Sequence, residues 1–176
     1  LGAPIAYILK ARVTMLRDMG QALSPFNAWM FLQGLETLPL RMREHCRNAE
    51  TVAKHLEAHP KVGKVIFAGL EKDPDIKARN EAHMAGGWGG LVGFELKGGA
   101  DAGMAFINGL KLLYHVANIG DARSLAIHPW STTHQQLSDE EKNAAGVTES
   151  YVRLSIGIEH IDDILEDLDQ ALAAAG

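Results

Sequence analysis

The spacing of apolar residues changes at Pro60, and this change constrains the fold more than any other feature of the sequence. Before Pro60, apolar residues recur every three or four positions over 4–19 and 25–59, the period of helices that bury one face. After it, the segments 62–68 and 91–96 are short, β-branched or aromatic, and bounded by Gly or Pro, as strands are. Further strands are expected at 112–118, 124–127 and 151–156. Helices are expected between and after them, at 103–110 opened by Asp101, 138–146 and 161–172. The order predicts an α+β fold, in which a small, mostly antiparallel sheet is covered on one face by helices.

Four residues are expected to shape the two helices that precede the sheet. Gly20 is a C-cap for the first helix, and Ser24 is an N-cap for the second, with Pro25 at its first position. Pro39 falls inside the long second pattern. Because proline lacks an N–H and clashes with the preceding turn, a kink is expected there.

Composition limits the classes of function. The chain has 176 residues, 47% of them hydrophobic, which suits one core and one domain, or one domain with a short attached segment. With 17 basic and 22 acidic side chains the net charge is -5, which argues against nucleic acid as a partner. No apolar run is long enough to span a membrane, and the first residues do not resemble a signal peptide. The single cysteine, Cys46, excludes an internal disulfide and fits a reducing cytoplasm.

Two clusters resemble ligand-binding motifs, but each is better explained without a ligand. Gly86–Gly90 lacks the lysine and hydroxyl of a phosphate-binding loop, so a flexible turn into the strand at Leu91 is favoured. His55 and His59 have the four-residue spacing of metal ligands on a helix, but no third ligand is near in sequence. We therefore expect surface histidines and no metal site.

The last third of the chain contains the most informative arrangement. Strand alternation over 151–156 places Val152 and Leu154 on one face and Arg153 on the other. Asn118 lies where another strand breaks. A guanidinium can bind both oxygens of a carboxylate at once, so this pair is a candidate carboxylate clamp. The alternative is a surface strand with its polar side in water, and the pattern alone favours that alternative.

Several motifs, in order along the chain, resemble the C-terminal domain of the Cys/Met-metabolism family of pyridoxal-phosphate enzymes. They are Leu23-Ser-Pro-Phe-Asn-Ala28, Gln33-Gly-Leu-Glu-Thr-Leu38 with Arg41, Asn118-Ile-Gly-Asp-Ala-Arg-Ser-Leu-Ala-Ile-His-Pro-Trp-Ser-Thr-Thr-His134 and Val152-Arg-Leu-Ser-Ile-Gly-Ile-Glu-His-Ile-Asp-Asp163. Asn118 with the Ser-Thr-Thr-His run is most similar to the O-acetylhomoserine sulfhydrylase (homocysteine synthase) subgroup. The resemblance implies the C-terminal domain of a fold-type I transferase.

The resemblance also implies an activity and a cofactor. Members of this subgroup use pyridoxal 5'-phosphate to replace the γ-acetoxy group of O-acetyl-L-homoserine with sulfide or a thiol. The matching Arg153 would bind the substrate α-carboxylate, and Asn118 would bind beside it. A methionine γ-lyase or cystathionine γ-synthase type is the alternative within the family, and a non-catalytic assembly domain is the alternative outside it. A homo-oligomer is expected.

One departure from the family pattern matters. The Ser-x-Thr-Lys type motif that carries the family's Schiff-base lysine is absent from these residues. The chain then resembles a linker helix at 1–22 and a C-terminal domain at 23–176. We therefore expect no catalytic residue in this chain, weak or no cofactor binding by the chain alone, and exposed apolar helix faces that promote self-association.

Overall fold

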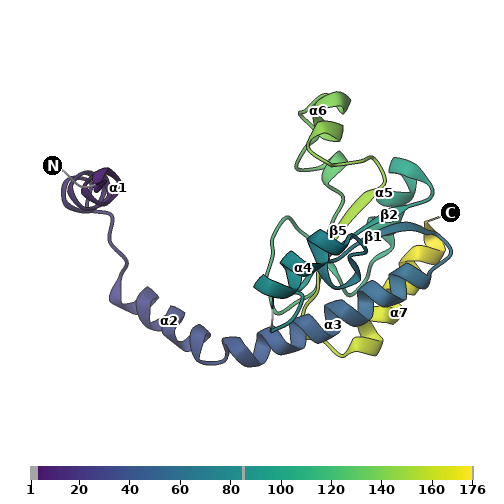
Figure 1. Cartoon of the computed structure of the whole chain (residues 1–176), viewed down its shortest axis with the longest axis horizontal. Helices are drawn as coiled ribbons and strands as arrows, with labels where there is room; N and C mark the ends of the chain where they lie inside the picture. The colour runs from purple at the N-terminus through teal and green to yellow at the C-terminus, as the bar shows by residue number, and fades with distance from the viewer. Residues whose placement is uncertain (1–3, 85, 176) are drawn as a thin grey trace. The chain divides into compact units, whose positions relative to one another are not determined.

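The computed structural model describes residues 4–84 and 86–175 (Figure 1). Contacts divide the chain into two compact units, one extending to Pro39 and the other starting at Leu40. Of the sequence predictions, those for residues 1–3, 85 and 176 lie outside the described residues.

The first unit consists of helices. α1 (Ala6–Leu9) continues as η1 (Lys10–Asp18), a π-helix, and Gly20 follows with a φ of 71°. The helix predicted over 4–19 and its glycine cap are therefore confirmed, whereas the wider π turns were not predicted. α2 (Pro25–Glu36) begins where expected, because the Ser24 hydroxyl accepts the N–H of Asn27 at 3.1 Å.

The long helix predicted over 25–59 is interrupted. α2 ends at Glu36 and α3 (Leu38–Ala58) begins after Thr37, so the prediction of one helix kinked at Pro39 was wrong. Pro39 lies in the first turn of α3. Proline costs no hydrogen bond at this position, because the first N–H groups of a helix have no carbonyl partner within the helix.

The second unit contains the predicted sheet. Its strands are β1 (Val62–Ile66), β2 (Leu91–Leu96), β3 (Tyr114–His115), β4 (Leu125–Ile127) and β5 (Tyr151–Ser155), in the order β1-β2-β5-β4-β3. Only the β3–β4 pair is parallel among the pairs of this sheet, so the prediction of a mostly antiparallel sheet is confirmed.

The strand predicted over 112–118 is shorter than expected. The buried carboxylate of Asp167 accepts the N–H groups of Lys111, Leu112 and Leu113 at 2.8–3.0 Å. These groups are therefore not available to a strand ladder, and only Tyr114–His115 pair with β4.

Helices cover one face of the sheet, as predicted. Buried side chains of α3, α5 (Gly99–Gly109) and α7 (Ile161–Ala174) form a single core with the sheet residues Val92, Phe94, Leu96, Val152 and Leu154. Figure 1 shows α3 and α7 side by side, and His55 of α3 hydrogen bonds to Asp169 of α7 at 2.6 Å. α5 starts four residues before the predicted helix, with Asp101 in its first turn.

Two shorter helices complete the unit. α4 (Pro74–His83) was not predicted, although Asp73 caps it by accepting two backbone N–H groups. α6 (Asp139–Ala144) has the predicted capping box, in which Ser138 and Glu141 bond each other's backbone N–H groups. Short 3₁₀ turns occupy Ala68–Leu70 and Pro129–Ser131. Across the described ranges, none of the helices has the length and apolarity needed to cross a membrane.

Candidate functional site

Arg153 lies at the centre of the sheet, on the face opposite the helices. Its neighbours in β5, Val152 and Leu154, are fully buried in the core, which confirms the predicted alternation. In register, Arg153 is paired with Gly93 of β2 and with Ile127 of β4. The backbone of Arg153 therefore belongs to an interior strand that is paired on both sides.

The donors of Arg153 are largely unfilled. Its Nε is buried and has no hydrogen-bond partner, and its Nη2 donates to the main-chain oxygen of Asn118 over 3.4 Å. Within residues 4–84 and 86–175, no carboxylate lies at ion-pair distance from it. A buried donor without an acceptor costs about 1–3 kcal/mol. Among the described residues, the one hydrogen-bond partner found for the Arg153 guanidinium is thus the Asn118 oxygen.

Asn118 lies beside Arg153, as the sequence predicted, but the contact is made by its backbone. The Asn118 side-chain oxygen accepts the N–H of Ile119 at 2.9 Å, which orders the turn that follows. Asn118 is exposed. A substrate-binding role for its amide stays a prediction.

Tyr151 and Gly93 shape the surroundings of the guanidinium. Tyr151 lies on the same face of β5 as Arg153, and a Cβ built on Gly93 would come within 2.7 Å of the Tyr151 ring. Burial raises the pKa of the Tyr151 phenol, with nearby Glu95 adding to the rise and the charge of Arg153 opposing it. Glycine at position 93 therefore leaves room for a neutral phenol beside the positive charge.

The irregular segment Asn118–Ser124, here called the 118–124 loop, is bound to β5 and to the turn that follows β5. The Ser155 hydroxyl accepts the N–H of Gly120 at 3.0 Å, and Ile158 donates its N–H to the Ala122 oxygen at 2.9 Å. The carboxylate of Glu159 accepts both the N–H and the hydroxyl of Ser124, at 2.6 and 2.9 Å.

The turn after β5 is bound in its own right to α3. The Asn48 amide donates to the main-chain oxygens of Gly157 and Glu159, and His45 bonds the Ile156 oxygen. The sequence places Ser155 on the same face of its strand as Arg153, but it predicted no role for Ser124, Ser155 or Glu159. No local pattern marks them, since their partners lie 33 to 35 residues away in sequence.

The other clusters considered in the sequence have structural roles. Gly87 and Gly89 have φ values of 140° and 83° in the segment that leads into β2, as a turn requires. His59 accepts the N–H of Lys61, and Cys46 is half-buried. In the described ranges, no group of three or more potential ligands has the geometry to hold a metal ion.

The fold and this site place the chain in a known class. The sequence profile of the Cys/Met metabolism PLP-dependent enzyme family matches residues 6–173, and the chain belongs to that family.

Individual relatives point to one subgroup. The O-acetyl-L-homoserine sulfhydrylase of Leptospira meyeri is 57% identical over 171 residues, which is 97% of this chain and 39% of that protein. The protein of the same name from Corynebacterium glutamicum is 51% identical over 174 residues, 99% of this chain and 39% of that protein. A crystal structure described as an O-acetylhomoserine (thiol)-lyase of Campylobacter jejuni, with pyridoxyl-lysine-5'-monophosphate, superposes with a TM-score of 0.86. It is 41% identical and covers 98% of this chain and 41% of that one. The chain thus spans about two fifths of the length of these relatives.

The described residues fit one part of a pyridoxal-phosphate site and not the rest. The guanidinium of Arg153, which has no carboxylate partner among the described residues, suits the carboxylate of an amino acid. The groups found around this guanidinium are the Asn118 backbone and the Tyr151 phenol, and no lysine of the described ranges hydrogen bonds to either. Around this guanidinium, the described residues thus supply groups suited to a carboxylate.

Proposed function

We propose that the full-length protein to which this chain belongs is a pyridoxal-phosphate-dependent sulfhydrylase. It would replace the γ-acetoxy group of O-acetyl-L-homoserine with sulfide or a thiol, giving homocysteine or a thioether such as methionine. The names of the relatives that are 57% and 51% identical support this reaction. The observation that carries the proposal is the place of Arg153 on an interior strand of the sheet, where its guanidinium has no carboxylate partner among the described residues.

The contribution of this chain would be to bind and orient the amino acid. The two oxygens of the α-carboxylate would accept from the guanidinium of Arg153, whose planar fork can bind both oxygens at once. Asn118 would bind beside it. Fixing the carboxylate fixes the rest of the substrate relative to the reacting centre, which lowers the entropic part of the barrier.

The reactive lysine and the cofactor site would lie in a part of the full-length protein outside these 176 residues. This division is supported by the fraction of the relatives that the chain spans, about two fifths. The chain alone would then be catalytically inert. The linker at 1–22 and the C-terminal domain at 23–176 remain the proposed domain boundaries.

We also infer a homo-oligomer and a cytoplasmic location. The first inference is supported by α2, whose large apolar side chains are exposed. The second is supported by the lone cysteine, which suits a reducing compartment.

The test is Arg153→Lys in the full-length protein, compared with Arg123→Lys as the control. Arg123 is an exposed arginine of the 118–124 loop that stacks 4.9 Å above the Tyr114 ring, and lysine can keep that contact. Lysine at 153 keeps the charge and loses the second hydrogen bond to the carboxylate. One charge-assisted hydrogen bond is worth about 1.5–3 kcal/mol, so the KM for the amino acid should rise about 10- to 150-fold.

Steady-state kinetics with O-acetylhomoserine, O-succinylhomoserine and methionine separates the alternatives. Turnover of O-acetylhomoserine with sulfide is expected. Preference for O-succinylhomoserine or for methionine elimination would replace the proposal with a cystathionine γ-synthase or methionine γ-lyase type. No turnover of any of them would favour an assembly domain, and an unchanged KM in Arg153→Lys would refute the role of Arg153.

A further inference from the structure

We propose that Ser155 and Glu159 are positioning residues that hold the 118–124 loop at the separation from Arg153 that an α-carboxylate requires. This inference rests on the function proposed above. It concerns residues that do not touch the substrate and act through the loop that carries Asn118.

The first anchor is the Ser155 hydroxyl. Ser155 is 4% exposed and lies two residues after Arg153, on the same face of β5. Its Oγ accepts the N–H of Gly120 at 3.0 Å, while Arg153 reaches the oxygen of Asn118. Arg153 and Ser155 are two residues apart in the strand, and their partners, Asn118 and Gly120, are two residues apart in the loop. The strand and the loop therefore run alongside each other.

The second anchor is Glu159. Its two carboxylate oxygens accept the N–H and the hydroxyl of Ser124, which is fully buried. The same Ser124 hydroxyl accepts the N–H of Gly157 at 2.8 Å. Both ends of the loop are thus attached to β5 or to the turn that follows it, and that turn is bound to α3 through Asn48.

These anchors decide the geometry because the contact at Arg153 is weak. At 3.4 Å, the bond from Arg153 Nη2 to the Asn118 oxygen is long for a hydrogen bond and contributes little to the position of the loop. Without the anchors, the Asn118 oxygen could close onto the guanidinium or move away from it. If the Asn118 oxygen moved onto the guanidinium, it would compete with the carboxylate. If it moved away, the carboxylate would lose its contact with the loop.

The experiment uses the full-length protein and the variants Ser155→Ala, Glu159→Ala and Glu159→Gln. The matched control is Thr148→Ala, which removes a hydrogen bond of 3.1 Å to Glu95 near the other end of β5. Each variant is assayed for the KM of O-acetylhomoserine, for kcat and for inhibition by 3-acetoxypropylamine, the same molecule without its carboxylate. Thermal unfolding is measured in parallel.

Loss of the Ser155 anchor should raise the KM for the amino acid about two- to tenfold, the equivalent of one net hydrogen bond. Glu159→Ala should raise it at least as much, and Glu159→Gln should restore most of the affinity because its oxygen still accepts the Ser124 N–H. The inhibition constant of the amine and kcat should stay within about twofold, since the loop acts on the carboxylate alone. Thr148→Ala should leave the KM unchanged.

The decisive comparison repeats Ser155→Ala in the Arg153→Lys background. If the loop acts through the arginine, the second substitution adds little to the KM, whereas independent effects multiply. Multiplying effects, or an equal loss of affinity for the amine, would overturn the positioning role. An unchanged KM in Arg153→Lys alone would instead refute the proposed function. If Glu159→Ala fails to fold, Ser155→Ala and Glu159→Gln decide the question.

Discussion

Replacing Arg153 with methionine should make the chain more stable while it destroys substrate binding. Methionine keeps an unbranched apolar stem and removes Nε, which is buried without a partner. Relief of that desolvation is worth about 1–3 kcal/mol, and the lost bond to the Asn118 oxygen is too long to offset more than about 0.5 kcal/mol. The expected net gain is about 0.5–2.5 kcal/mol in the free energy of unfolding.

The assay is urea unfolding of the 176-residue chain, followed by tryptophan fluorescence, with the slope against urea checked for constancy. Arg123→Met is the control, because it removes an exposed guanidinium stacked on Tyr114 and should cost no more than about 1 kcal/mol. In the full-length protein, Arg153→Met should raise the KM for the amino acid by more than Arg153→Lys does. A loss of more than about 1 kcal/mol in Arg153→Met would refute the reasoning, because it would mean that the guanidinium is already satisfied within the chain.

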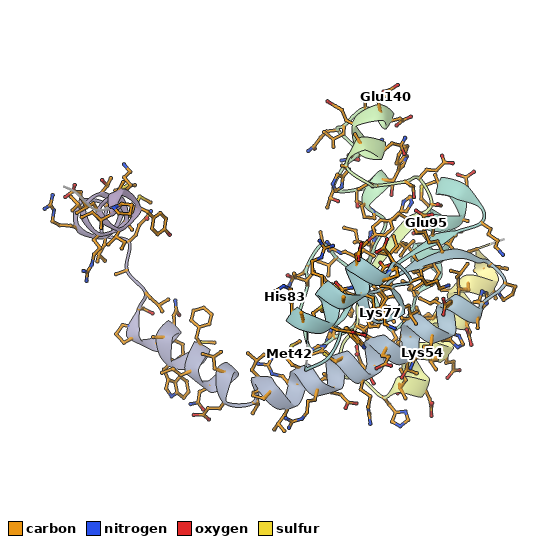
Figure 2. All side chains as sticks on the ribbon, viewed as in Figure 1. Met42, Lys54, Lys77, His83, Glu95 and Glu140 are labelled. Carbon is orange, nitrogen blue, oxygen red and sulfur yellow. The ribbon has the colours of Figure 1, made fainter. Side chains whose placement is uncertain are left out.

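Two further predictions concern the stability and association of the chain. Asp167→Asn should lower the free energy of unfolding by about 2–4 kcal/mol, because an amide NH₂ would face backbone donors that now bond a buried carboxylate. The exposed Asp163→Asn in the same helix should change it by less than about 0.5 kcal/mol, and similar losses in both variants in urea unfolding would contradict this account. The chain should also self-associate through α2, whose exposed apolar side chains include Trp29 and Phe31 and whose side chains project from all sides of the helix in Figure 2. Light scattering should show a mass that rises with concentration and falls when both are changed to Ser; a constant monomer mass would count against it.

Features that depend on neighbours in sequence could be predicted. The side of β5 on which Arg153 lies follows from strand alternation, and the capping box at Ser138 follows from residues three apart. The glycine after the first helix was also identified correctly, since only a residue free to adopt a positive φ suits that position. The binding role of Arg153, however, could be predicted only from the family resemblance, because the pattern alone favours a surface arginine in a strand.

Features that depend on distant residues were missed or wrong. The strand predicted over 112–118 is shorter in the structure because Asp167 in α7 accepts the N–H groups of its first residues. The break at Thr37 is a local feature, two residues before Pro39, and the apolar period that runs through it does not mark its position.

The amino-acid sequence by itself determined the fold class, the family and the presence of one guanidinium on the open face of the sheet, because periodicity and motif spacing are properties of the local chain. Only the tertiary structure decided that the Nε of this guanidinium is buried without an acceptor and that Ser155 and Glu159 hold the loop beside it. The physical reason is that burial and hydrogen-bond partners depend on which distant segments the folded core brings together.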